Sequence, residues 1–231
     1  MSLKLVGVAG STCTRRALIA LEETGAPYEL QVVSMHTGEH KSAEYLEKHQ
    51  PFGRVPALHE DDFHMYESRA ITRYIAEKFD KTGKLYPSDP RKRAVVEQWI
   101  SVEGSYFNAA EKIVAELYFK PVYHKVPADA SVVAAEDVRL HECLVVLNKR
   151  LGVSKYLAGE DFTVADIVYM PYTAYLLMQP TYANVFDKYE NVARWWKDVS
   201  SRPSWNKVVA MSNTQNLLQI FYWLILINII F

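Results

Sequence analysis

The chain has 231 residues, of which 49% are hydrophobic and 23% are charged, and its formal net charge is -1. This composition is typical of a globular protein with one large domain or two small ones. The near-neutral charge argues against a general nucleic-acid binder and against binding to anionic membrane surfaces. Because the two cysteines, Cys13 and Cys143, have no metal-site or disulfide spacing, we expect a reducing, cytoplasmic location and no bound metal.

The first 80 residues alternate between strand and helix patterns. LKLVGV at 3–8 predicts a strand, a helical spacing of apolar residues runs from Thr12 to Gly25, and YELQVV at 28–33 predicts a second strand. Further on, VPAL and FHMY flank an acidic turn and predict a β-hairpin, after which Ser68 opens another helix. The order β-α-β then β-β-α predicts an α/β domain at residues 1–81 whose first two strands are parallel.

The pattern changes after this domain. Gly83, Pro87 and Pro90 predict a linker at residues 82–93. Only helical periodicity follows, so we expect an all-helical domain at residues 94–213. Within it, FTVAD predicts a helix start with a capping box, in which Thr163 is the N-cap and Asp166 occupies the third helical position.

Residues 214–231 are expected to form an apolar tail outside both domains. The stretch LLQIFYWLILINIIF at 217–231 carries no charge. It has about 15 residues, whereas a bilayer-spanning helix needs roughly 20. We therefore expect a segment packed on the body or on a partner, or an artefact of read-through or of the gene model, in preference to a membrane anchor.

The stretch GSTCTRRAL at 10–18 raises the question of whether it activates a thiol or only caps a helix. It places Ser11, Thr12 and Cys13 at the start of the first helix. A helix N-terminus offers unpaired N–H groups and partial positive charge, which stabilise a thiolate, and a nearby hydroxyl can donate a further hydrogen bond to sulfur. The stretch is equally typical of a helix that is simply capped by serine.

Three stretches in combination resemble the cytosolic glutathione S-transferases, and most of all their phi class. They are GSTCTRRALIALEETG, GEHKSAEYLEKHQPFGRVPAL and MYESRAITRYIAEKF, and LAGEDFTVADIVYMPY and WWKDVSSRPSW extend the similarity to about residue 211. The resemblance implies a thioredoxin-like N-terminal domain that binds glutathione, followed by a helical bundle that carries the site for the electrophile.

The resemblance also assigns the residues of a glutathione site. Ser11, four residues after Gly7, matches the catalytic serine whose hydroxyl hydrogen-bonds to the glutathione sulfur. The remaining contacts are implied at His40, Lys41, Arg54, Val55, Glu67 and Ser68, with a cis peptide bond before Pro56. Val55 is expected to pair with the cysteinyl residue, Glu67 and Ser68 to hold the γ-glutamyl group, and the basic residues to lie near the glycyl carboxylate.

The electrophile site is expected on the first long helix of the second domain. Its candidate lining is Ser105, Tyr106, Phe107, Ala110 and Tyr118. An aromatic stripe at helical spacing is also the usual pattern of a core-facing surface, so the residues alone leave both interpretations open.

The resemblance implies a homodimeric enzyme, a glutathione transferase of the EC 2.5.1.18 type. It would conjugate glutathione to hydrophobic electrophiles and reduce organic hydroperoxides, with glutathione as co-substrate. Two alternatives stay open: a non-catalytic, ligandin-type binding protein, and a thiol transferase that depends on Cys13. Two residues along a helix correspond to about 200 degrees of rotation, so Ser11 and Cys13 are expected to face different directions.

Overall fold

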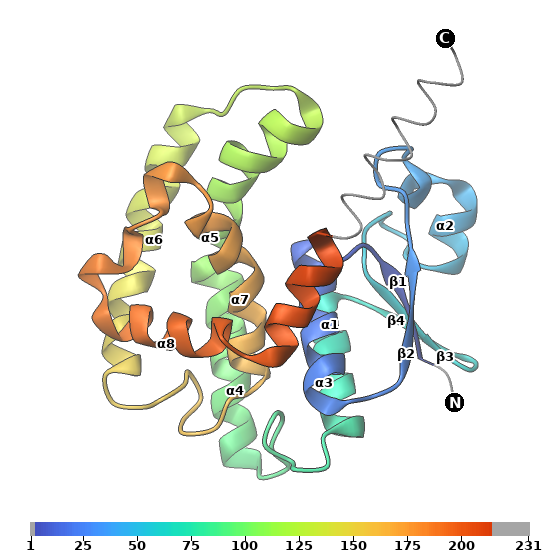
Figure 1. The fold of residues 1–231 in the computed structure, drawn as a ribbon, viewed down its shortest axis with the longest axis horizontal. Helices are drawn as coiled ribbons and strands as arrows, with labels where there is room; N and C mark the ends of the chain where they lie inside the picture. The colour runs from blue at the N-terminus through green and yellow to red at the C-terminus, as the bar shows by residue number, and fades with distance from the viewer. Residues whose placement is uncertain (1–2, 214–231) are drawn as a thin grey trace. The chain divides into compact units, whose positions relative to one another are not determined.

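The computed structural model describes residues 3–213, which form two compact units (Figure 1). The described part of the first unit comprises residues 3–79 and 202–213, and the second comprises residues 80–201. The apolar tail expected at 214–231 lies outside the described residues. Within residues 3–213, every helix is too short or too polar to span a bilayer.

The first unit is a four-stranded sheet with helices on both faces. In chain order it contains β1 (Leu3–Gly7), α1 (Thr12–Thr24), β2 (Tyr28–Val32), the 3-10 turn η1 (Glu39–Lys41), α2 (Ala43–Lys48), β3 (Ala57–Glu60), β4 (Phe63–Tyr66) and α3 (Ser68–Phe79). The strand order is β2-β1-β3-β4, with β1 parallel to β2 and antiparallel to β3. This is the predicted βαβ-ββα order; α1 and α3 lie side by side on one face and α2 lies on the other (Figure 1).

The sequence sets both ends of α1. The Ser11 side chain accepts a hydrogen bond from the Thr14 N–H as the N-cap, and Gly25 ends the helix in the left-handed conformation that glycine adopts without steric cost. At the end of β1, a Cβ added to Gly7 would lie 2.8 Å from Thr14 Oγ1. The strand therefore approaches α1 so closely that glycine is required, which fixes where Ser11 emerges from the sheet.

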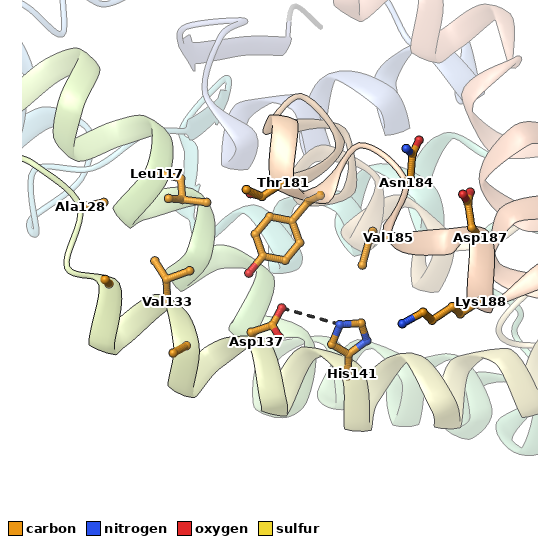
Figure 2. Close-up of a pocket in the computed structure, with 13 residues that line it drawn as sticks. Leu117, Ala128, Val133, Asp137, His141, Thr181, Asn184, Val185, Asp187 and Lys188 are labelled. Carbon is orange, nitrogen blue, oxygen red and sulfur yellow. Dashed lines mark ion pairs between the residues drawn. The ribbon is translucent and has the colours of Figure 1, made fainter.

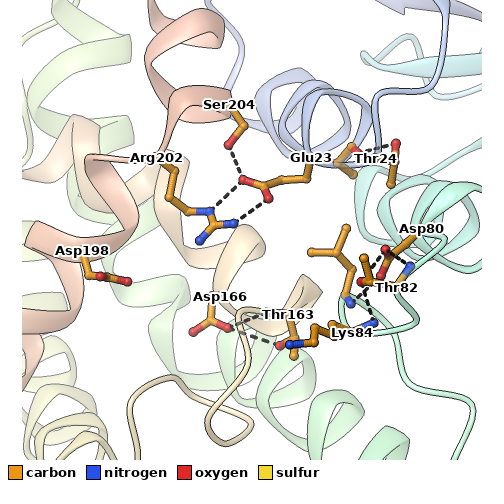
Figure 3. Close-up of polar contacts among 12 residues, drawn as sticks. Glu23, Thr24, Asp80, Thr82, Lys84, Thr163, Asp166, Asp198, Arg202 and Ser204 are labelled. Atoms are coloured by element: carbon orange, nitrogen blue, oxygen red, sulfur yellow. Dashed lines mark hydrogen bonds and ion pairs between the residues drawn. The ribbon is translucent and has the colours of Figure 1, made fainter.

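Helical residues 203–213 belong to the first unit, which differs from the domain boundary expected from the sequence. The Arg202 guanidinium binds the Glu23 carboxylate through two hydrogen bonds of 2.7 and 2.6 Å, and the Ser204 hydroxyl donates to the same carboxylate (Figure 3). Arg15 Nη2 also donates to Ser212 Oγ at 2.9 Å. Periodicity identified this helix correctly, but it carries no information about these long-range partners.

The second unit is all-helical. It contains α4 (Pro90–Val102), η2 (Glu103–Phe107), α5 (Asn108–Val114), η3 (Ala115–His124), α6 (Ala130–Leu151), α7 (Val164–Leu177), the short 3-10 turns η4 (Pro180–Tyr182) and η5 (Val185–Lys188), and α8 (Glu190–Ser200). Helix α4 begins at Pro90 with Asp89 as N-cap, so residues 90–93 of the expected linker are helical. The segments η2 and η3 are π-helical, and π-turns of this kind are frequent at functional sites.

The predicted capping box at the start of α7 is present. Asp166 is fully buried, and one of its oxygens accepts from both the N–H and the hydroxyl of Thr163 (Figure 3). Its second oxygen accepts from the Leu157 N–H at 3.0 Å and from Trp195 Nε1 at 2.9 Å. One carboxylate therefore ties the start of α7 to α8 and to the loop that precedes it.

Candidate glutathione site

Ser11 lies at the N-terminus of α1 with its hydroxyl proton available. Its Oγ accepts from the Thr14 N–H at 3.4 Å, and its own N–H donates to the Val8 carbonyl at 2.9 Å. Within the described residues, the hydroxyl has no acceptor, and the N–H groups of Thr12 and Cys13 have none either. Three donors therefore surround one helix N-terminus, which is the arrangement that stabilises an anion such as a thiolate.

A buried arginine joins α1 to the start of α3. Arg16 is fully buried, and its Nη1 donates to Ser68 Oγ at 3.4 Å. Ser68 begins α3, and its main-chain N–H has no acceptor within residues 3–213. The preceding Glu67 is exposed and has φ 74°, a left-handed conformation that is costly for a non-glycine residue and recurs at binding sites. Ser68 and Glu67 thus present a hydroxyl, a free N–H and a carboxylate together at the start of α3.

The loop before β3 has the geometry needed to hold an extended peptide. The Val55–Pro56 bond is cis, as the resemblance implied. Val55 packs against the cluster that contains Tyr45 and Ala57, and its N–H and C=O have no hydrogen-bond partner among the described residues. An exposed main-chain donor and acceptor at a strand end can pair with an extended ligand as another strand would.

Two buried side chains support that loop from α2 and from the segment that follows it. The Gln50 side-chain oxygen accepts from the N–H groups of Phe52 (2.7 Å) and Arg54 (3.2 Å), and the Tyr45 hydroxyl donates to the Arg54 carbonyl at 2.7 Å. Burial and Glu39 raise the Tyr45 pKa to about 12, which keeps the phenol a neutral donor. Arg54 itself is exposed, so its guanidinium is free to meet a carboxylate.

His40 and Lys41 lie against the same loop. Lys41 Nζ donates to the Phe52 carbonyl at 3.2 Å, and a Cβ added to Gly53, whose φ is +61°, would lie 2.8 Å from the His40 carbonyl. Burial and the neighbouring Lys41 lower the pKa of His40, against an opposing effect of Glu39. Its buried Nδ1 has no partner within the described residues. The structure thus brings His40 and Lys41 together with Arg54 around one loop.

The two cysteines have different surroundings. Cys13 is half-buried in the first turn of α1, and its Sγ lies 3.6 Å from Arg16 Nη1. Cys143 is buried in α6, where desolvation and the charge of Glu103 raise its pKa to about 12. No group of three or more metal-ligating side chains within residues 3–213 is arranged to hold a metal ion.

The candidates for the electrophile site separate into two groups. Tyr106 is 62% exposed and Ser105 is also exposed, and both lie in the π-helical η2. In contrast, Phe107 is 2% exposed and contacts Tyr169 at a ring distance of 4.9 Å, and Ala110 is fully buried. Phe107 and Ala110 are therefore packed inside the helical unit, whereas Ser105 and Tyr106 face solvent.

Tyr118 belongs to an aromatic cluster that the sequence did not reveal. Its ring centroid lies 5.1 Å from that of Tyr175 and 6.3 Å from that of Tyr123, and Phe119 lies 5.7 Å from Tyr175. We call these four residues the aromatic cluster. Tyr123 is 60% exposed, so the cluster is open to solvent at one edge. It gathers around the π-helical η3, whose altered turn changes which side chains share a face.

Comparison with known proteins agrees with this geometry. Residues 1–77 match the family described as Glutathione S-transferase, N-terminal domain, and residues 108–203 match its C-terminal domain. Glutathione S-transferase F12 of Arabidopsis thaliana is 38% identical over 216 residues, which cover 92% of this chain and 99% of the relative. The chain belongs to the phi class of the glutathione S-transferase family.

Solved structures of phi-class relatives have the same fold. The crystal structure of glutathione transferase F2 from Populus trichocarpa superposes with a TM-score of 0.86 at 37% identity and covers 92% of this chain and 99% of its own. Glutathione S-transferase I from mais, solved in complex with an atrazine glutathione conjugate, gives a TM-score of 0.84 at 37% identity and covers 91% and 98% of the two chains. The predicted thioredoxin-like domain and helical domain, and the assignment as a glutathione transferase, are therefore confirmed.

The sequence analysis did not identify the residues that hold the binding residues of this phi-class site in place. Arg16, Gln50 and Tyr45 touch the binding residues but were not proposed. A charged residue in the middle of an apolar helix face is a signal for Arg16, because an arginine there must find buried partners. Gln50 and Tyr45 carry no such signal, since either residue is common on a helix surface.

Proposed function

We propose that Ser11 and the N-terminus of α1 stabilise the thiolate of bound glutathione, and that this thiolate attacks hydrophobic electrophiles. The observation that carries the proposal is the hydroxyl proton of Ser11: its Oγ accepts from the Thr14 N–H and donates to no acceptor among the described residues. One hydrogen bond to the sulfur is worth roughly 1.4 to 2 kcal/mol, or about ten- to thirtyfold in thiolate population. The N–H groups of Thr12 and Cys13 add to this stabilisation.

The reaction requires no covalent bond between the enzyme and the substrate. The thiol loses its proton to solvent, the sulfur forms a bond to the electrophilic carbon, and the leaving group departs with its electron pair. With an organic hydroperoxide, the sulfur attacks the terminal oxygen and the alcohol leaves, and a second glutathione then converts the resulting sulfenic acid to the disulfide and water. Holding the two reactants together supplies much of the remaining rate gain.

The other site residues bind the remaining parts of glutathione in this proposal. Val55 offers a main-chain donor and acceptor to the cysteinyl residue. Ser68 offers its hydroxyl and N–H to the γ-glutamyl carboxylate, and Glu67 accepts from the α-amine. His40, Lys41 and Arg54 face the glycyl carboxylate, where a guanidinium matches a carboxylate with two parallel hydrogen bonds.

For the electrophile we propose Ser105, Tyr106 and the aromatic cluster, which combines residues of η3 with Tyr175 of α7. Aromatic rings provide a large apolar surface and favourable stacking for flat substrates. The mais enzyme, 37% identical to this chain, was solved with a glutathione conjugate of atrazine. By analogy we propose that this chain accepts electrophiles with an aromatic or heteroaromatic ring.

Two further properties follow from the resemblance. We propose that the chain forms a homodimer, which sedimentation equilibrium tests directly through the mass relative to the 26.5 kDa chain. We also propose a cytoplasmic location, for which the two free cysteines give support because disulfides are rare in a reducing compartment. Fractionation of cells that express the tagged protein tests the location.

The proposed activity is tested by conjugation of glutathione to 1-chloro-2,4-dinitrobenzene. We expect activity in the parent and at least a tenfold loss in Ser11→Ala with glutathione binding retained. Asp89→Ala is the matched control, because it also removes an N-cap, that of α4, at a similar cost of about 1 kcal/mol. Full activity in Ser11→Ala contradicts the assignment. An inactive parent that binds glutathione favours a binding protein or the Cys13 thiol transferase.

A further inference from the structure

The helical unit has an open pocket of about 670 Å³ whose lining includes none of the residues assigned above. One wall is α6, which presents Ala130, Val133 and Ala134, and the opposite wall is the segment of η4 and η5 with Val185 (Figure 2). Volumes of 300–1,000 Å³ are typical of small-molecule sites. The small side chains on α6 leave this space open, because a larger residue at these positions would fill it.

A connected set of polar groups lies at one end of the cavity. Asp137 and His141, one turn apart on α6, form an ion-pair contact of 3.7 Å between Oδ1 and Nε2 (Figure 2). The Tyr182 phenol lies near Asp137, and His141 Nδ1 lies 2.8 Å from the Tyr189 hydroxyl. Burial and Asp137 raise the pKa of Tyr182, so the phenol stays neutral beside the carboxylate.

The carboxylate of Asp137 lacks a permanent counter-charge. Within residues 3–213, no lysine or arginine nitrogen lies within 4.0 Å of it. Its polar neighbours are the imidazole of His141 and the phenol of Tyr182, and its side chain remains 40% exposed. Lys188 also lines the cavity but makes no such contact with Asp137. The pocket thus combines an apolar wall with the incompletely paired carboxylate of Asp137, while Asp187 and Lys188 add one charge of each sign to the lining.

We propose that this cavity binds a small amphipathic amine, with its apolar body on the alanine and valine wall of α6 and its ammonium group on Asp137. A charge-assisted hydrogen bond from an ammonium to a held carboxylate is among the stronger polar contacts. Because Asp137 lies on the regular helix α6, its carboxylate is placed at the pocket before the ligand arrives, which lowers the entropic cost of binding. The apolar wall supplies the remaining affinity by burial of the ligand's ring.

The test uses two probes with one ring system and opposite charge. They are 2-(1-naphthyl)ethylamine and 3-(1-naphthyl)propanoate, each titrated at pH 7.5 into the full chain labelled with ¹³C at alanine and valine methyl groups. We expect saturable methyl shifts centred on Ala134, Val133 and Val185 with the amine, and binding of the acid weaker by about tenfold or more.

Four variants separate the charge from the cavity. Asp137→Asn is expected to weaken the amine about tenfold, whereas Glu142→Gln, which removes an exposed charge from the same helix, is expected to leave it unchanged. Ala134→Phe places a ring in the pocket and is expected to abolish binding, whereas Ala135→Phe, at the neighbouring position outside the lining, is not; both positions are exposed. Conjugation activity in Ala134→Phe is expected to match the parent, which distinguishes this site from the glutathione site.

Three results would overturn the proposal. The first is the absence of saturable shifts at these methyl groups, and the second is equal binding of the amine and the acid. The third is unchanged amine binding in both Asp137→Asn and Ala134→Phe. Each outcome concerns binding in the helical unit alone, so none depends on whether Ser11 activates glutathione.

Discussion

Arg16 Nη1 and Ser68 Oγ lie 3.4 Å apart, although the two residues are 52 positions apart in the chain. The contact crosses from the first turns of α1, which carry Ser11, to the first residue of α3, which carries the proposed γ-glutamyl contacts. Because Arg16 is fully buried, its position is fixed by packing. The two halves of the proposed glutathione site are therefore coupled through one side chain that is not expected to touch glutathione.

Replacing Arg16 is expected to weaken glutathione binding more than turnover. Arg16→Lys keeps the charge but loses the planar set of donors that reaches both Ser68 and Cys13. We expect a KM for glutathione raised several-fold, a smaller change in kcat, and a loss of about 2 to 3 kcal/mol in unfolding free energy. Arg91→Lys, at an exposed position on α4, is the control. A stability loss with an unchanged KM would show that Arg16 has only a structural role.

A methyl group on Gly7 is expected to displace α1 from the sheet. The added Cβ would lie 2.8 Å from Thr14 Oγ1 and 2.9 Å from Thr14 Cγ2, and overpacking of this kind costs about 1 to 3 kcal/mol. Gly7→Ala should lower the unfolding free energy by that amount and also reduce conjugation, because Ser11 moves with the helix. Gly104→Ala, where the new Cβ meets nothing within 4 Å, should be neutral or slightly stabilising. Chemical denaturation of both variants is the measurement, and equal stability contradicts the close approach.

A cluster of three histidines is expected to make the first unit sensitive to acid. His49 Nδ1 lies 2.9 Å from His59 Nε2, and the rings of His59 and His64 stack at 4.7 Å. Burial, followed by the charges of His64, His49 and Lys4, lowers the pKa of His59 to about 4. The unfolded chain, with a histidine pKa near 6.5, therefore binds more protons than the folded chain between these values. Stability is fully present above about pH 6.5 and is lost as the pH falls towards about 4.

His59→Gln is expected to flatten this dependence. Glutamine does not titrate, and its amide can still hydrogen-bond to His49. The control is His36→Gln, at an exposed position in the same unit. The measurement is the unfolding free energy at several pH values between 4 and 7.5. A slope in His59→Gln equal to that of the parent would assign the acid sensitivity to other groups.

The two thiols are expected to differ in reactivity. A disulfide reagent such as DTNB should titrate one thiol in the native protein and both after denaturation, because Cys143 is buried and its pKa is raised to about 12. Cys13→Ser should remove the native reaction, and Cys143→Ser should leave it unchanged. Cys13→Ser should also keep most of the conjugation activity. Loss of conjugation in that variant would favour the Cys13-dependent mechanism.

Much of the fold followed from local sequence signals. Ser11 and Gly25 mark the ends of α1, and Thr163 and Asp166 mark the start of α7, because caps depend on residues only a few positions apart. The interruption of the long helical run by η2 and η3 was not predicted, since π-turns leave the hydrophobic period almost unchanged over a few residues. Within η2, Phe107 is buried while Tyr106 beside it is exposed, because successive side chains of a helix point about 100 degrees apart.

The residues of the site also differ in whether a local sequence signal identifies them. Ser11, Val55 and Ser68 came from motifs in which a local element, a helix start or a strand end, presents the functional atoms. Contacts between distant segments had no such signal. Examples are Arg16 with Ser68, and Arg202 with Glu23, which attaches the last described helix to the first unit. The cavity beside Asp137 likewise depends on how the chain after α7 packs on α6.

The most direct test of the central claim is the pKa of the glutathione thiol when bound. The thiolate absorbs near 240 nm, so a pH titration of the complex against free glutathione gives this value for the parent and for Ser11→Ala. A hydrogen bond from the Ser11 hydroxyl predicts a bound pKa well below the ordinary thiol value of about 8.5, and a rise of roughly one unit in Ser11→Ala. An identical pKa in the two proteins, with glutathione bound to both, would contradict the role of Ser11.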